Sequence, residues 1–107
     1  MLNVHITLKA KGQALLYEAP PILASGAINK ITFDLVLSEE WSGFRDYYVI
    51  MRRSGVVRAC RVSNGSAIAD SEAIAGAGAL EVSILAEKPG ARITTERVIL
   101  KLKDSGI

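Results

Sequence analysis

Hydrophobic and polar residues alternate with a period of two along most of the chain. The first segment shows the pattern over seven residues, with Leu2, Val4, Ile6 and Leu8 separated by Asn3, His5 and Thr7. Residues 30–37 repeat it, with Ile31, Phe33, Leu35 and Leu37 on one side. Such alternation is typical of β-strands that bury one face. We therefore expect strands at both segments, with their apolar faces turned toward one core.

Turn-forming residues divide the rest of the chain into further short strands, which are expected at 13–19, 45–53, 56–62, 66–69, 80–87 and 92–104. Spacing of roughly 8–12 residues between turn signals favours an all-β fold, an antiparallel β-sandwich (Ig-like or jelly-roll-like) of about seven or eight short strands. The residues expected inside it are Phe33, Leu35, Val49, Val82, Ile84, Val98 and Leu100.

One segment departs from this period. Asp70 or Ser71 can cap a helix, and an acidic residue follows in the first turn. Gly76 and Gly78 would end such a helix quickly. We expect one short helical turn near residues 71–75.

Ser54 and Gly55 predict a tight hairpin turn between two apolar runs. A two-residue turn sets Arg53 opposite Val56 and fixes every later pair. The predicted core-side pairs are Val49 with Cys60 and Tyr47 with Val62, while Met51 faces Arg58 and, on the other face, Tyr48 meets Arg61.

The composition indicates one globular domain, residues 1–107. Half of the 107 residues are hydrophobic and 22% are charged. A formal net charge of +2 gives no reason to expect a nucleic-acid partner. The alternating start is unlike a signal peptide, and no apolar run reaches the roughly 18 residues of a membrane span. We expect a soluble protein made in the cytoplasm, without membrane insertion.

Candidate catalytic and metal-binding residues are few. His5 is the only histidine and lies on the polar side of its strand, so we expect it to face solvent, without a zinc site. Cys60 is the only cysteine and is expected to fill the core rather than act as a nucleophile. Glu39 and Glu40 are neighbours in a turn, where acids are usually solvated. We therefore expect no enzymatic activity, cofactor or metal.

Five arginines and one acid lie between Arg45 and Arg61. Two interpretations stay open. The arginines can form a surface for an anionic partner, since planar guanidinium groups suit carboxylates and phosphates. Alternatively, they line the exposed face of a hairpin and lay their stems over apolar neighbours. The candidate partner-contact residues are Arg52, Arg53, Arg58 and Arg61.

Trp41, the only tryptophan, lies in the polar turn 38–44. A loop tryptophan near Tyr47 and Tyr48 has the composition of a sugar-binding or protein-binding patch. However, Trp41 stands four residues after the inward-facing Leu37, and a sharp bend can fold its ring back over the open end of a sandwich. We expect a structural plug made of Trp41, Gly43 and Phe44.

Several motifs together resemble a known family. They are "WSGF" at 41–44, "YYVIM" at 47–51, "CRVSNG" at 60–65, "LEVSI" at 80–84 and the closing "RITTERVILKLKDSG" at 92–106. Together they are similar to the amino-terminal attachment domain of baseplate and tail-fibre (upper baseplate) proteins in tailed phages of Gram-positive hosts. Two positions depart from the family pattern: Asp70 where proline is common, and Ala86 where glycine is common.

The resemblance implies a non-enzymatic virion structural protein that works through symmetric protein–protein assembly, in a tail, baseplate or decoration role. Its partners would be other phage structural proteins and further copies of itself. Family members continue into a fibre or receptor-binding module where this chain ends at Ile107, so we expect either an accessory protein or an attachment domain alone. The alternatives are a glycan-binding sandwich that uses Trp41 and the nearby tyrosines on a host surface, and an accessory or inhibitor domain of an enzyme.

Overall fold

The protein is a β-sandwich in the computed structural model, which describes residues 2–18, 28–69 and 78–102. The strands confirm the predicted all-β class, and the expected helical turn near 71–75 lies outside the described residues. The described elements are β1 (Leu2–Lys11), β2 (Ala14–Glu18), β3 (Ile28–Leu37), the 3-10 turn η1 (Glu39–Trp41), β4 (Asp46–Arg53), β5 (Val56–Arg61), β6 (Ser66–Ile68), β7 (Gly78–Lys88), β8 (Ala91–Thr94) and β9 (Val98–Leu102).

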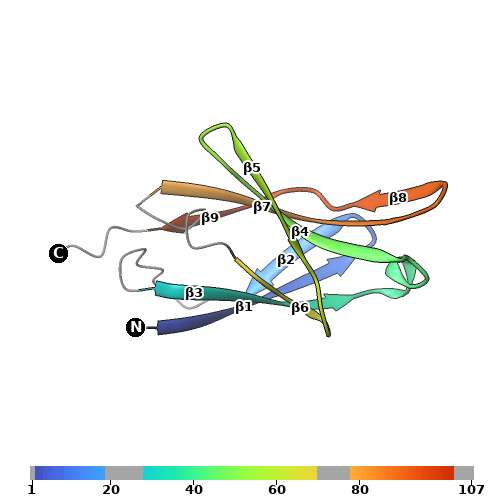
Figure 1. Ribbon diagram of the computed structural model, residues 1–107, viewed down its shortest axis with the longest axis horizontal. Helices are drawn as coiled ribbons and strands as arrows, with labels where there is room; N and C mark the ends of the chain where they lie inside the picture. Colours follow the sequence, from blue (N-terminus) through green and yellow to red (C-terminus); the bar gives the residue numbers. More distant parts are fainter. Residues whose placement is uncertain (1, 19–27, 70–77, 103–107) are drawn as a thin grey trace.

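The strands form two layers (Figure 1). The four-stranded sheet has the order β2-β1-β3-β6, and the five-stranded sheet has the order β5-β4-β7-β8, with β9 also paired with β7. Seven of these nine strands pair only in the antiparallel sense. The exception to the expected antiparallel pairing is β1 with β3, which run parallel from the Leu2–Ile28 pair to the Ala10–Leu37 pair. β2 folds back along one edge of β1, and β3 lies on the other edge and runs in the same direction as β1.

The core lies between the two sheets and is built from alternate residues of their strands. Phe33, Val49, Val82 and Ile84 have no exposed surface, and Leu100 is 1% exposed, as the period of two predicts. Leu35 and Val98, which were also expected inside, are partly buried and pack against this core. The interior therefore follows from binary patterning.

The β4–β5 hairpin has the predicted register, with Arg53 opposite Val56, Val49 opposite Cys60 and Tyr48 opposite Arg61. Ser54 and Gly55 both have positive φ angles, 50° and 79°, as a two-residue hairpin turn of this hand requires.

The segment 92–104 was expected to form one strand, but it is divided into β8 and β9. Leu85 pairs with Thr94 and Val82 pairs with Val98, so two residues of β7 face the three residues 95–97. This extra residue is a β-bulge. Thr95 stabilises it, because its buried hydroxyl accepts a hydrogen bond from the backbone N–H of Ile84 at 2.9 Å. Alternation alone does not reveal such an insertion.

Trp41 lies where the chain passes from the four-stranded to the five-stranded sheet. Its side chain is 1% exposed, and its indole N–H donates to the carbonyl oxygen of Gly12, in the β1–β2 turn, at 2.8 Å. The Tyr47 hydroxyl donates to the Trp41 carbonyl oxygen at 2.5 Å. Two short turns and the start of β4 are thereby held around one indole ring.

Glu40 reinforces the same turn. Its carboxylate accepts hydrogen bonds from the Ser38 hydroxyl and from the backbone N–H of Gly12. The hydrogen bond from Ser38, and then those from backbone N–H groups, hold the pKa of Glu40 below its ordinary value. Beyond the ring, Gly43 has a φ of 82°, and Phe44 packs partly buried against the core with the Lys88 ammonium 5.0 Å from its ring centre.

We expect Trp41→Ala to lower the free energy of unfolding by about 3–5 kcal/mol, because it removes a large buried aromatic side chain. Trp41→Phe keeps most of the apolar volume and loses the hydrogen bond to Gly12, so its cost should be clearly smaller. Urea unfolding measures both variants. Wild-type fluorescence should be blue-shifted and poorly quenched by iodide. Easily quenched emission, or equal stability of Trp41→Ala and wild type, would contradict this role of the ring.

Candidate interaction surface on the open edge of the sandwich

The four candidate arginines all lie on the β4–β5 hairpin, but on two different faces of it. Arg52 and Arg61 share the outer face of the five-stranded sheet, because they alternate with the buried Val49 and Met51. Arg53 and Arg58 lie on the opposite face, toward the turn. The turn stands away from the rest of the molecule (Figure 1). The hairpin therefore carries positive charge on both sides.

The surroundings of these arginines differ. Arg61 forms an ion pair with Asp46 at 2.8 Å, with 71% of the Arg61 side chain exposed. The guanidinium of Arg53 lies over Gly78, where an added Cβ would be 3.3 Å from its Nη2 atom. Arg52 lines a surface groove that also contains Arg53, Arg97 and Glu81. An exposed ion pair such as Arg61–Asp46 contributes little stability, so Arg61 is able to exchange partners at small cost.

The outer edge of β5 is the second feature of this surface. Among the described residues β5 pairs only with β4. The N–H of Val62 donates to the carbonyl oxygen of Tyr47 at 2.9 Å, so this pair and every second pair after it are hydrogen-bonded. The intervening residues of β5 direct their backbone N–H and C=O groups away from β4. These residues are Val57, Ala59 and Arg61.

A groove of about 860 Å³ separates this edge from β6, the edge strand of the other sheet. Val57 and Ala59 line it on the β5 side, and Ser66 and Ile68 on the β6 side. Val57 is 50% exposed and Ile68 is 54% exposed. Apolar side chains thus flank backbone groups that pair with no other strand among the described residues, a combination that favours addition of another strand.

The aromatic residues do not gather on this surface. Trp41 is buried, and Tyr47 is half-buried with its hydroxyl bound to the Trp41 backbone. Tyr48 lies half-buried on the outer face of the sheet, opposite Arg61. An exposed platform made of Trp41 with both tyrosines, which a sugar ring would need, is therefore not formed by these three side chains.

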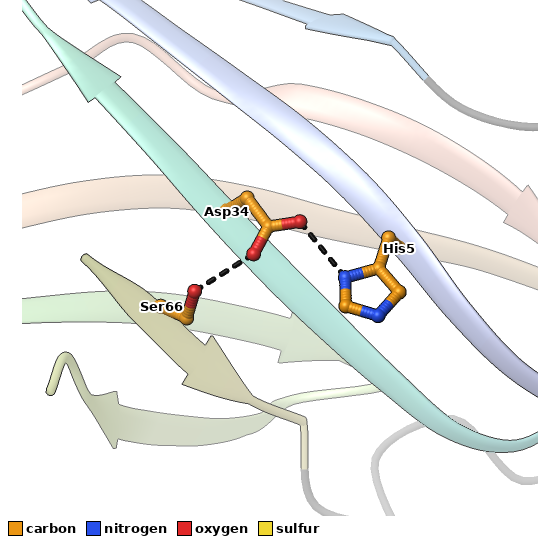
Figure 2. A network of polar contacts seen from close by, with 3 residues as sticks. All are labelled: His5, Asp34 and Ser66. Atoms are coloured by element: carbon orange, nitrogen blue, oxygen red, sulfur yellow. Dashed lines mark hydrogen bonds and ion pairs between the residues drawn. The ribbon is translucent and has the colours of Figure 1, made fainter. Parts of the chain in front are cut away.

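A polar network crosses the outer face of the four-stranded sheet (Figure 2). Asp34 of β3 accepts a hydrogen bond from the Ser66 hydroxyl of β6 at 2.7 Å, and its second oxygen lies 2.9 Å from Nδ1 of His5 of β1. The aspartate stands between the serine and the histidine. In a catalytic triad the histidine occupies the middle and removes the serine proton. The order found here joins three strands, and the group beside the Ser66 hydroxyl is the Asp34 carboxylate instead of the His5 imidazole.

The hydrogen bond from Ser66, and then that from His5, lower the pKa of Asp34 below its ordinary value of 3.8. His5 is exposed, as expected, but its hydrogen bond was not foreseen. The link requires β1 and β3 to be parallel neighbours, and the sequence contained no signal for that pairing.

Cys60 is half-buried and packs against the core from its place opposite Val49. Within the described part of the chain, no three residues of the His, Cys, Asp and Glu types group closely enough to hold a metal ion. The same residues include no helix of the length and apolar character needed to cross a membrane.

The arginines of the hairpin were predicted from the sequence, but the β5 edge and its groove with β6 were not. The available signal was the hairpin register itself, since alternation of bonded and non-bonded pairs follows once the turn is fixed. Which edge stays open depends on the neighbours of β4.

No family model matches the chain, and no curated protein matches it in a sequence search.

We expect Ser66→Ala to raise the pKa of Asp34 toward its ordinary value, because it removes the larger of the two stabilising hydrogen bonds. A carbon-detected NMR titration of the carboxyl group measures this. Asp34 has a folded-state pKa below its unfolded value, so its contribution to stability is present above about pH 4 and is lost as the pH falls through the folded pKa. In Asp34→Asn, the free energy of unfolding should therefore decrease less than in the wild type as the pH falls below about 4. An Asp34 pKa that is the same in Ser66→Ala as in the wild type would contradict the role assigned to the Ser66–Asp34 hydrogen bond.

Proposed function

We propose that this protein is a non-enzymatic structural component of a phage virion, an attachment or decoration domain of a tail or baseplate that works through symmetric protein–protein assembly. It is made in the cytoplasm of the bacterial host and acts in the virion. Its partners are other virion proteins and further copies of itself, and its role requires no cofactor, nucleic acid or membrane insertion.

The observation that supports this proposal most directly is the β4–β5 hairpin. This protruding element carries exposed valine side chains, arginines on both faces, and a β5 edge that pairs with no other strand in the described part of the chain. A protein that functions as a lone monomer commonly protects such an edge. Among the described residues of β5, the charges of Arg58 and Arg61 supply such protection, and planar guanidinium groups also suit contact with carboxylates of a neighbouring subunit.

The sequence motifs add the biological setting. The resemblance to phage attachment domains covers nearly the whole chain and includes the "WSGF" turn at 41–44. In this structure that turn closes the end of the sandwich at which Trp41 binds Gly12. A rigid scaffold that positions a charged, open-edged hairpin is suited to assembly.

We expect the double reversal Arg53→Glu with Arg58→Glu to abolish self-association or incorporation into particles while the domain stays folded. Interfacial charges that lose their partners cost about 2–5 kcal/mol each, enough to empty a weak symmetric interface. Light scattering and chemical cross-linking measure association, and circular dichroism measures folding.

The matched control is Arg45→Glu with Arg92→Glu. It changes the net charge by the same amount. Arg45 and Arg92 line a groove beside the β7–β8 turn. Arg45 precedes β4 whereas the hairpin turn follows β4, so the control residue lies at the opposite end of that strand. The control variant should associate as the wild type does. A wild-type protein that is monomeric and binds no virion protein, or a hairpin variant that assembles normally, would overturn the proposal.

A further inference from the structure

We propose that β5 pairs antiparallel with β5 of a second copy of this chain, about a two-fold axis that passes through Ala59. The inference rests on the proposed assembly function and names its surface and its partner. The pairing would join two five-stranded sheets into one continuous sheet across the dimer.

The backbone of β5 limits the possible registers. Strand addition needs residues with outward-facing N–H and C=O groups, and in β5 these are Val57, Ala59 and Arg61. An axis through Ala59 gives all three a partner: Ala59 faces Ala59 of the second copy, and Val57 faces Arg61 of the second copy. The ladder then contains about six new hydrogen bonds.

Neighbouring registers are poorer. An axis through Arg58 places two arginines directly opposite each other, and like charges at such positions are destabilising. An axis through Cys60 places Val57 opposite Ser63, whose backbone N–H and carbonyl oxygen already bond to Ser66 at 2.8 and 3.1 Å. Either shift leaves one outward-facing residue of each copy without a good partner.

The side chains agree with the axis at Ala59. On the outer face each Arg61 lies opposite a valine, and on the other face each Arg58 lies opposite Cys60 of the second copy, so no arginine meets an arginine. Ala59 itself is small and exposed, which allows close approach at the axis. The added strand enters the groove beside β6 and covers Ile68, now 54% exposed.

Disulfide cross-linking tests the register, in a Cys60→Ser background that removes the only native thiol. Ala59→Cys places two thiols at the axis, with Cα atoms about 5.5 Å apart, within the disulfide range of about 4.4–6.8 Å. Val57→Cys is the matched control on the same face of the same strand. Its two copies would be displaced by about 13 Å along the strand. Ala59→Cys should form a dimer under mild oxidation at least tenfold faster than Val57→Cys.

A proline tests the backbone contribution. The N–H of Ala59 is not used within the hairpin, so Ala59→Pro should keep the β4–β5 ladder and block addition at the edge. Ala59→Thr keeps the N–H and is the control. In sedimentation equilibrium at about 100 µM, wild type and Ala59→Thr should show dimer, and Ala59→Pro monomer with unchanged circular dichroism.

Equal cross-linking of the two cysteine variants, or equal masses of Ala59→Pro and wild type, would overturn this pairing. That result would not by itself overturn the assembly function, which depends on the arginine reversal and on incorporation into particles. Loss of incorporation in Arg53→Glu with Arg58→Glu together with failed β5 pairing would identify a different virion protein as the hairpin's partner.

Discussion

The hydrogen bond from the Trp41 indole to the Gly12 carbonyl oxygen, together with the burial of that ring, is the contact on which the arrangement of the sheets depends. Gly12 belongs to the β1–β2 turn of one sheet, while Trp41 leads into β4 of the other. The Thr95–Arg97 bulge reaches the same place, because Glu96 donates its N–H to Gln13 at 2.8 Å. Three connections are thus fixed at one end of the sandwich, and the sheets are aligned from there.

Fixing one end leaves the lateral edge between β5 and β6 available for contacts. Apart from the β5–β6 region, the two sheets also approach each other at β2 and β9, where the Tyr17 hydroxyl reaches the Ile99 carbonyl oxygen at 3.5 Å. On the β5 side, the exposed apolar residues are Val56, Val57 and Ile68, and Val57, Ala59 and Arg61 direct their backbone groups away from β4. An assembly contact there can form without disturbing Trp41, so folding and association are served by different parts of the domain.

Much of the fold could be predicted from local pattern. The core positions Phe33, Val49 and Ile84 follow from alternation, and the hairpin register follows from Ser54-Gly55. The parallel pairing of β1 with β3 could not be predicted, since alternation is the same for either strand direction. The network at Asp34 depends on that pairing and was missed with it. The bulge at Thr95 was missed because one inserted residue leaves both flanking patterns intact.

The interaction surface could be predicted from the sequence only in part. The sequence places four arginines on one hairpin, but it does not show that β5 is an edge strand. That fact depends on β7 taking the other side of β4, a contact between segments more than 25 residues apart.

The order in which the strands of the two sheets occur along the chain has a consequence for how the chain folds. Every described pairing of the four-stranded sheet lies within residues 2–68, whereas the five-stranded sheet needs residues up to 102. During synthesis the first sheet therefore has all its strands before the second can be completed, and until β7 arrives its apolar face has only the β4–β5 hairpin to cover it.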